Sequence, residues 1–229
     1  MFYEPGSTRH GLAFDPFKAC VVPRPIGWIS TTSPAGVDNL APFSQFQNVS
    51  YDPPTILFCA NQNLDGRRKD TVVNIEANGE FVWNMATYEL RDAVNVTATD
   101  LPPDTDEFER AGLQKAASQR VRPPRVAASP VHFECRHLQT VRIPGNGALG
   151  TVDVVFGRVI AIHIADHALN AQGRIDITRL RPLARVGYHD YTSVESVFTM
   201  PPTGGPGRAA GLEGSPEKVA AALALRNGK

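Results

Sequence analysis

Polar side chains gather in an early block of the sequence whose segments otherwise have the composition of buried strands. Hydroxyl and amide groups on such strands can hydrogen-bond the edge of a planar heterocycle, and an indole ring can cover its apolar face. Threonine is common in strands and tryptophan in cores, so these residues taken alone favour a structural role over a binding role. The residues of this block are Trp28, Ser30, Thr31, Thr32, Ser44, Gln47, Asn48 and Ser50.

A second block, residues 67–71, places three cations, a carboxylate and a hydroxyl where a helix is predicted to begin. The first N–H groups of a helix have no partner within it, and together with adjacent cations they form a natural phosphate site. The alternative is a solvated turn in which Asp70 or Thr71 caps the helix. This block alone does not decide between the two interpretations.

Motifs of other chemistries are missing from the sequence. The six histidines form no HExxH motif, and there is neither a GxSxG elbow nor a Walker-type loop. We therefore expect no metal site and nominate no catalytic side chain. The cysteines Cys20, Cys59 and Cys135 form no CxxC pair, so we expect reduced thiols, with Cys59 in the core.

Charge and hydropathy argue against several classes of protein. The 229 residues contain 23 Lys and Arg and 23 Asp and Glu, and this balance argues against a broad nucleic-acid-binding surface. No run of about 18 apolar residues predicts a membrane span. The first residues lack a basic segment followed by an apolar one, so we expect no secretion signal and a cytoplasmic location.

The pattern of β-branched residues and turns predicts a mainly β fold with a few short helices. Many short strands with little helix favour a barrel over a doubly wound sheet. Helices are expected over 71–78, ended by Gly79; after Thr87, with Leu90, Ala93, Val94 and Ala98 at helical spacing; and over 107–111. Strands are expected over residues 21–22, 26–32, 40–50, 55–60, 80–85, 131–143, 151–164 and 175–177.

A change of composition near Thr199 predicts two parts. Residues 1–198 are expected to form the main domain, and residues 199–229 begin with a Pro- and Gly-rich linker. Ser215 and Pro216 are typical of a helix start, so we expect a helical tail. So short a helix either packs against another surface, such as a partner subunit, or frays in solvent.

Six segments follow one another in a specific order: RPIGWISTTSPAGVDNLAPFSQFQNVSYDPPTILF, RRKDTVVNI, GEFVWNM, DEFERAGL, SPVHFECR and PLARVGYHDY. The most specific pieces are NLAPFS with the following DPP, and KDT before a helix. This succession resembles the flavin reductase-like proteins of the FMN-binding split-barrel superfamily, which includes flavoredoxin and the reductase components of two-component monooxygenases. The resemblance covers roughly residues 12 to 192 and implies an FMN-binding split β-barrel.

The resemblance also implies which residues bind the flavin. The segment from Trp28 to Thr32 would lie along the isoalloxazine ring, and the segment before the helix at residue 71 would meet the phosphate, as its cations independently suggest. His189 matches a position near the cofactor or the partner subunit, with an exposed histidine as the alternative. The predicted cofactor-binding residues are Trp28, Ser30, Thr31, Thr32, Ser44, Gln47, Asn48, Asn61, Lys69, Asp70 and Thr71.

In function, the resemblance implies a flavin reductase that uses NADH or NADPH and binds FMN, with FAD as the alternative cofactor. Two other functions stay open: an electron-transfer flavoprotein of the flavoredoxin type, and a flavoprotein oxygenase with a small organic substrate. A homodimer is implied, and a separate oxygenase that receives reduced flavin is a candidate partner. The extension 199–229 and the insertion 101–105 could cover the flavin face and restrict access of the nicotinamide.

Overall fold

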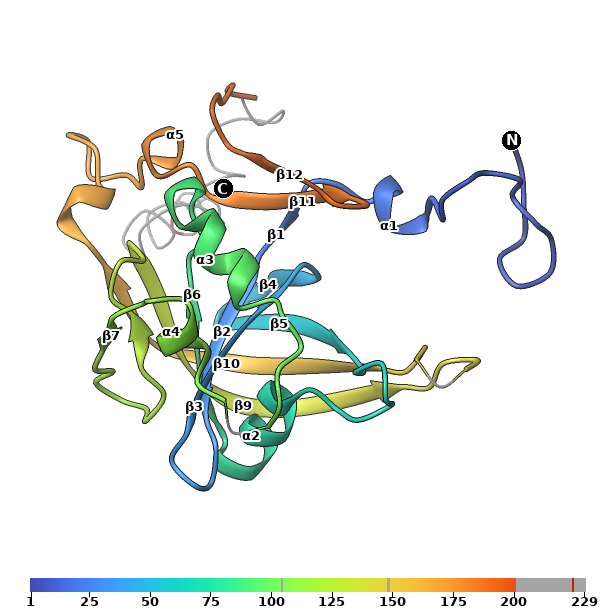
Figure 1. The fold of residues 1–229 in the computed structure, drawn as a ribbon. Helices are drawn as coiled ribbons and strands as arrows, with labels where there is room; N and C mark the ends of the chain where they lie inside the picture. Colours follow the sequence, from blue (N-terminus) through green and yellow to red (C-terminus); the bar gives the residue numbers. More distant parts are fainter. Residues whose placement is uncertain (104, 148, 201–223, 225–229) are drawn as a thin grey trace. The chain divides into compact units, whose positions relative to one another are not determined.

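The computed structural model describes residues 1–103, 105–147, 149–200 and 224. The chain divides into two compact units, Met1–Glu195 and Ser196–Lys229, and every element described below belongs to the first. The helix predicted to begin at Ser215 lies outside the described residues. Figure 1 shows that strands dominate the first unit and that its helices are short, which confirms the predicted fold class.

The main sheet is antiparallel and has seven strands in the order β3-β2-β6-β9-β10-β5-β4. The long strands β9 and β10, both predicted as strands from the sequence, pair along most of their length near the middle of the sheet. At Gly157 of β10 a Cβ atom would lie 2.2 Å from the ring of Phe81, so this close approach requires glycine. The strands are β2 (Gly27–Thr32), β3 (Asp38–Phe43), β4 (Phe46–Tyr51), β5 (Pro54–Asn61), β6 (Glu80–Asn84), β9 (Val131–Ile143) and β10 (Val152–Ile164).

The two edge strands of this sheet, β3 and β4, are consecutive in the sequence. One continuous strand over 40–50 was expected, and this prediction is wrong, because the chain leaves the first edge at Phe43 and joins the opposite edge at Phe46. The sheet therefore curls until its edges come near each other, and β3 also contacts β5. At the crossing, the Cys59 N–H donates a hydrogen bond of 2.8 Å to the Gln45 carbonyl.

Smaller sheets flank the barrel. One has the order β1-β11-β12, with β1 (Arg24–Pro25), β11 (Leu183–Gly187) and β12 (Asp190–Ser193), and the other pairs β7 (Lys115–Ala116) with β8 (Arg125–Val126). The strand predicted at 21–22 is wrong, since these exposed valines follow the helix α1 (Phe17–Cys20) and precede β1. The strand predicted over 175–177 is also wrong, because Ile175 makes one isolated bridge to Leu169 and the helix α5 (Ile177–Leu180) begins two residues later. The Asp176 carboxylate caps that helix by accepting from the Arg179 N–H.

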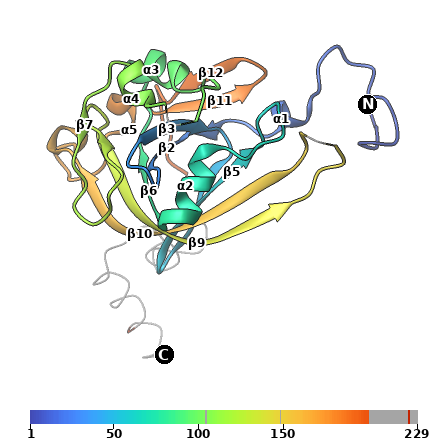
Figure 2. The ribbon, with the colours of Figure 1, turned by 60° about the horizontal axis from the view of Figure 1, so that its bottom comes forward.

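The helix α2 (Asp70–Asn78) ends at Gly79, whose φ of 70° is the left-handed conformation that glycine favours, so this prediction is confirmed. Figure 2 shows α2 against the curled sheet, where it contacts β2, β3 and β6. α4 (Glu107–Arg110) is also found where predicted, whereas the cap expected from Thr87 is wrong because its side chain bonds no helix N–H. The remaining helices are η1 (Tyr88–Leu90), α3 (Arg91–Val96) and η2 (Asp166–Ala168).

Two apolar clusters stabilise the unit, and β2 lies between them. Ile29 packs into the barrel interior with Phe58 and Phe81. Trp28, the residue before Ile29, packs into a second cluster with Phe108 of α4. Successive side chains of a strand point to opposite faces, so both faces of β2 are covered by apolar groups.

Candidate functional site

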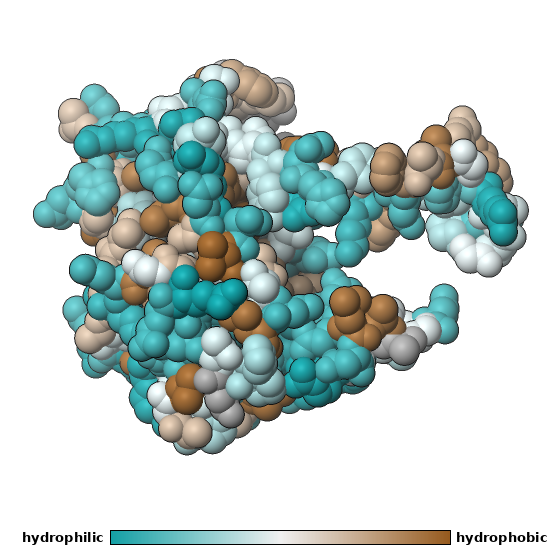
Figure 3. Space-filling view, in the orientation of Figure 1, coloured by the Kyte–Doolittle hydropathy of each residue, from teal (hydrophilic) through white to brown (hydrophobic). Residues whose placement is uncertain are grey.

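A cleft of about 690 Å³ lies between two walls of the first unit. One wall comes from the β3–β4 connection, the end of β5 and the start of α2. The other comes from the N-terminal segment, β1 and the β11–β12 turn. The surface is hollowed on the side where the N-terminal segment projects (Figure 3). The lining residues include Phe14, Phe17, Lys18, Arg24, Pro42, Phe43, Ser44, Gln45, Cys59, Asn61, Lys69, Arg185 and Tyr188.

At Lys69 the cleft joins a smaller pocket of about 70 Å³, which is built around the first turn of α2. The two spaces share Pro42, Phe43 and Lys69. Lys69 is the cap residue of this helix, its carbonyl accepts from the Val72 and Val73 N–H groups, and its ammonium lies 2.5 Å from the Asp100 carboxylate. One end of the cleft therefore combines Lys69 and a helix N-terminus with the carboxylates of Asp70, Asp100 and Glu107, so an anion bound here would replace Asp100 as the partner of Lys69.

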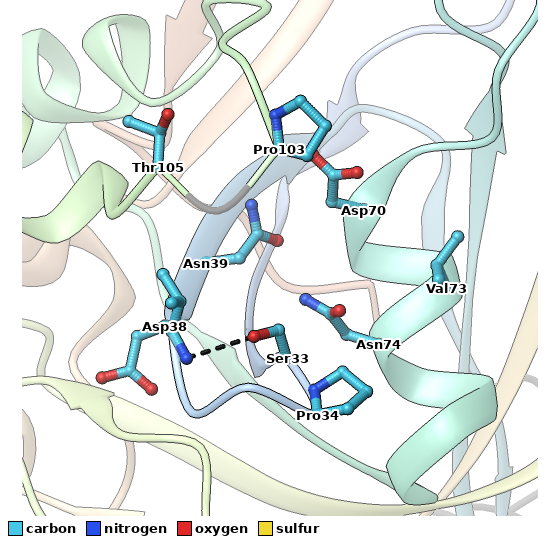
Figure 4. A pocket seen from close by; sticks show the side chains of 10 residues that line it. Ser33, Pro34, Asp38, Asn39, Asp70, Val73, Asn74, Pro103 and Thr105 are labelled. Atoms are coloured by element: carbon cyan, nitrogen blue, oxygen red, sulfur yellow. Dashed lines mark hydrogen bonds between the residues drawn. The ribbon is translucent and has the colours of Figure 1, made fainter.

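A third pocket, of about 200 Å³, continues on the far side of Asp70 (Figure 4). Asn39 from β3 faces Asp70 and Asn74 from α2 across it, while the turn before β3 closes it from below. That turn is held by a hydrogen bond of 3.1 Å from the Val37 N–H to the Ser33 hydroxyl. This pocket is lined by carboxylate and amide groups and contains no cation among its described lining residues.

A buried polar network fixes the start of α2 against β3. The Glu107 carboxylate accepts from the Asn39 amide at 2.9 and 3.0 Å and from the Leu40 N–H at 2.9 Å. The Asn39 oxygen in turn accepts from the Thr71 hydroxyl at 2.8 Å. Burial raises the pKa of Glu107, and its hydrogen-bond donors are uncharged groups that offset this only in part. These buried hydrogen bonds therefore hold the start of α2 in a fixed position against β3.

Five of the predicted cofactor-binding residues come together at this site. Ser44, Asn61 and Lys69 line the cleft, and Lys69, Asp70 and Thr71 line the pocket at the helix start. Ser44 lies at the crossing between β3 and β4, and Asn61 ends β5. The structure therefore brings together residues from three separate segments of the sequence.

The predicted residues of β2 are not brought to the cleft. Trp28 is fully buried and donates a hydrogen bond of 2.9 Å from its indole N–H to the Thr97 hydroxyl. Ser30 is also buried and donates to the Pro124 carbonyl at 2.6 Å. Thr31 and Thr32 bond side chains of β3, and neither lines the cleft. The physical reason is that β2 is an inner strand with both faces covered.

Gln47 and Asn48 are also absent from the cleft. Both lie on the edge strand β4, are exposed, and pair through their backbones with Leu57 and Ile56 of β5. Their position follows from the break between β3 and β4, which carries β4 past the cleft to the opposite edge of the sheet.

Other lining residues were missed or interpreted differently from the sequence. Cys59, expected in the core, lies half-buried on the cleft wall, where burial raises the pKa of its thiol. In the β11–β12 turn it is Tyr188, and not His189, that lines the cleft. Arg24 and Arg185 pair in register between β1 and β11, and no local pattern in the sequence connects two residues so far apart.

The sequence was compared with known protein families and with curated relatives. The family profile described as "Flavin reductase like domain" matches residues 19–184, which is most of the chain. The chain belongs to this family. Among curated relatives, a protein of Halalkalibacterium halodurans is 37% identical over 79% of this chain and 86% of its own length. A relative from Aquifex aeolicus is 36% identical over 73% of this chain and 82% of its own length.

Solved structures of similar proteins confirm the split-barrel fold. Nitrilotriacetate monooxygenase component B from Bacillus cereus is 30% identical, with a TM-score of 0.79 over 87% of this chain and 98% of that one. Flavoredoxin of Desulfovibrio vulgaris, at 17% identity, has a TM-score of 0.67 over 90% of this chain and 100% of that one, a likeness of fold. No helix in the described part of this flavin reductase-like chain is long and apolar enough to cross a membrane.

Proposed function

We propose that this protein binds FMN in the cleft and uses it as an NADH- or NADPH-dependent flavin reductase. The observation that supports this most directly is the joined pair of cavities, in which an open cleft ends at Lys69 and the N-terminus of α2. Membership of the flavin reductase-like family supports the same cofactor. FAD is the alternative flavin, and its longer phosphate chain would have to pass Asp70.

The residues present fit a flavin mononucleotide. The volume of the cleft, about 690 Å³, falls within the usual range for small-molecule sites. Lys69 and the helix N–H groups would hold the phosphate, and Ser44 and Asn61 would contact the polar parts of the molecule. Phe43, which is largely buried in the cleft wall, would supply apolar surface against the ring.

When bound, FMN would supply a two-electron acceptor for hydride from a nicotinamide donor. The protein's own part is to bind and orient. The hydrogen-bond network of Glu107, Asn39 and Thr71 holds the start of α2, where Lys69 would meet the phosphate, and the open side of the cleft would admit the donor. We assign no side chain as a general base.

The partners belong to the same proposal. We propose a cytoplasmic homodimer that passes reduced flavin to a separate oxygenase. The support for the oxygenase is the 30% identity to a protein that is itself component B of a monooxygenase. A size measurement in solution, together with oxygenase activity in a reconstituted mixture, tests these two points separately.

The decisive experiment is an anaerobic absorbance titration of the purified protein with FMN, followed by NADH and then NADPH. We expect flavin bands that shift on binding and then bleach rapidly with at least one donor. Bands that persist with both donors but bleach with dithionite would favour an electron-transfer flavoprotein or an oxygenase. A chain that binds neither FMN nor FAD would contradict the proposal as a whole.

A further inference from the structure

Three cations on the wall opposite α2 have no carboxylate partner. Lys18, Arg24 and Arg185 all line the cleft, and within the described part of the chain none of them forms an ion pair. Lys69 on the other wall is neutralised by Asp100. The only carboxylate among the described lining residues of the cleft, Asp15, caps the turn before α1 by accepting from the Phe17 N–H at 2.8 Å.

Arg24 and Arg185 are direct neighbours across the β1–β11 pair. Arg24 donates to the carbonyls of Lys18 and Val21, and its Nε is buried without a hydrogen-bond partner. Arg185 donates to the Tyr191 hydroxyl at 2.7 Å and to the Tyr188 carbonyl, with its guanidinium 4.7 Å from the centre of the Tyr191 ring. These contacts orient both guanidinium groups and leave their positive charge uncompensated.

Like charges directly opposite each other on two strands repel, so this pair is costly unless an anion joins it. Guanidinium groups bind phosphate oxygens through paired N–H donors, and two of them match the two charges of a pyrophosphate. We propose that Arg24 and Arg185 bind the pyrophosphate of the nicotinamide dinucleotide while its nicotinamide lies over the flavin. This inference rests on the proposed function and names the residues that hold the electron donor.

A flavin phosphate has the same chemistry, and the geometry favours the donor instead. In the proposed function the flavin phosphate replaces Asp100 at Lys69, at the end of the cleft that joins the smaller pocket. Arg24 and Arg185 belong to the other wall, and neither lines that pocket. A second anionic molecule that enters the cleft over the flavin would therefore contact Arg24 and Arg185.

The test is Arg185→Gln, with Arg24→Gln as a second variant, in the FMN-loaded protein. We expect the KM for NADH or NADPH to rise about tenfold, with kcat changed less than about twofold. Calorimetric binding of NAD⁺ or NADP⁺ should weaken by a similar factor. Inorganic pyrophosphate should compete with the donor in the wild type and lose most of this effect in both variants.

The control is Arg179→Gln, which removes an exposed arginine on α5 that does not line the cleft. It should leave the KM, dinucleotide binding and inhibition by pyrophosphate unchanged. An unchanged KM and unchanged dinucleotide binding in Arg185→Gln and Arg24→Gln would overturn the inference. So would a loss of FMN affinity without a loss of riboflavin affinity, because the anion would then be the flavin phosphate. If wild-type protein binds FMN and is not reduced by either donor, the reductase proposal fails, and this inference fails with it.

Discussion

The two walls of the cleft differ in whether their cations are paired with carboxylates. On the α2 wall, formed by the β3–β4 connection, the end of β5 and the start of α2, cations are matched by carboxylates: Lys69 pairs with Asp100, and Arg68 pairs with Glu76 and Asp153. On the β11 wall, formed by the N-terminal segment, β1 and β11, Arg24 and Arg185 donate to carbonyl and phenol groups, and neither forms an ion pair within the described part of the chain. The α2 wall is thus a scaffold fixed by the core, whereas the β11 wall keeps its charge available for a ligand.

The largest expected effect concerns the network behind the α2 wall. Glu107→Ala should lower the free energy of unfolding by about 3 kcal/mol, because it leaves the Asn39 amide and the Leu40 N–H buried without an acceptor. Urea denaturation followed by far-UV circular dichroism measures this. A loss below about 1 kcal/mol would show that the α2 wall does not depend on this carboxylate.

Glu107→Gln is the control variant that keeps the size of the side chain and removes its ability to ionise. The folded state raises the pKa of Glu107 through burial, so the folded protein holds this proton more tightly than the unfolded chain. The resulting stabilisation is complete below the ordinary value of 4.5 and is lost as the pH rises through the raised pKa. Wild type should therefore gain stability relative to Glu107→Gln as the pH falls through that window.

The next prediction compares the loss of stability on replacing one arginine next to each wall, Arg68 beside the α2 wall and Arg24 on the β11 wall. Arg68→Gln should cost about 2 kcal/mol of stability, because Asp153, whose side chain is 2% exposed, loses its partner at 2.9 Å and keeps only Arg142 at 3.4 Å. Arg24→Gln should cost less than about 0.5 kcal/mol, since no carboxylate loses a partner. Thermal unfolding of both variants measures these losses of stability. Equal losses would contradict the difference between the two walls.

The smallest effect is on flavin binding at the α2 wall. Lys69→Ala should weaken FMN about tenfold, roughly 1–2 kcal/mol, and leave riboflavin nearly unchanged, because riboflavin has no phosphate. Asp100→Asn is the matched variant and should tighten FMN about two- to threefold, because it releases Lys69 from its ion pair. Fluorescence titration with both flavins measures this, and an equal loss for both in Lys69→Ala would place the phosphate elsewhere.

Local patterns in the sequence located the elements that carry the α2 wall. The cationic segment before Thr71 and the glycine after Asn78 bound a helix that is found over Asp70–Asn78. The pattern of β2 was less informative. Alternation assigns its side chains to two faces, and does not reveal that the second face is covered by Phe108 and Val126. For this reason Trp28 and Ser30 were expected at the flavin and are found in the core.

The sequence by itself therefore determined the family, the mainly β fold and the cationic helix start, since these depend on motifs and on spacing within a few residues. The tertiary structure alone decided which polar groups meet. Asn39 and Glu107 are 68 residues apart and share hydrogen bonds, and Arg24 reaches Arg185 only through the register of β1 and β11. Strand register and the curl of a sheet are set by packing across the whole barrel, which no local pattern of residues encodes.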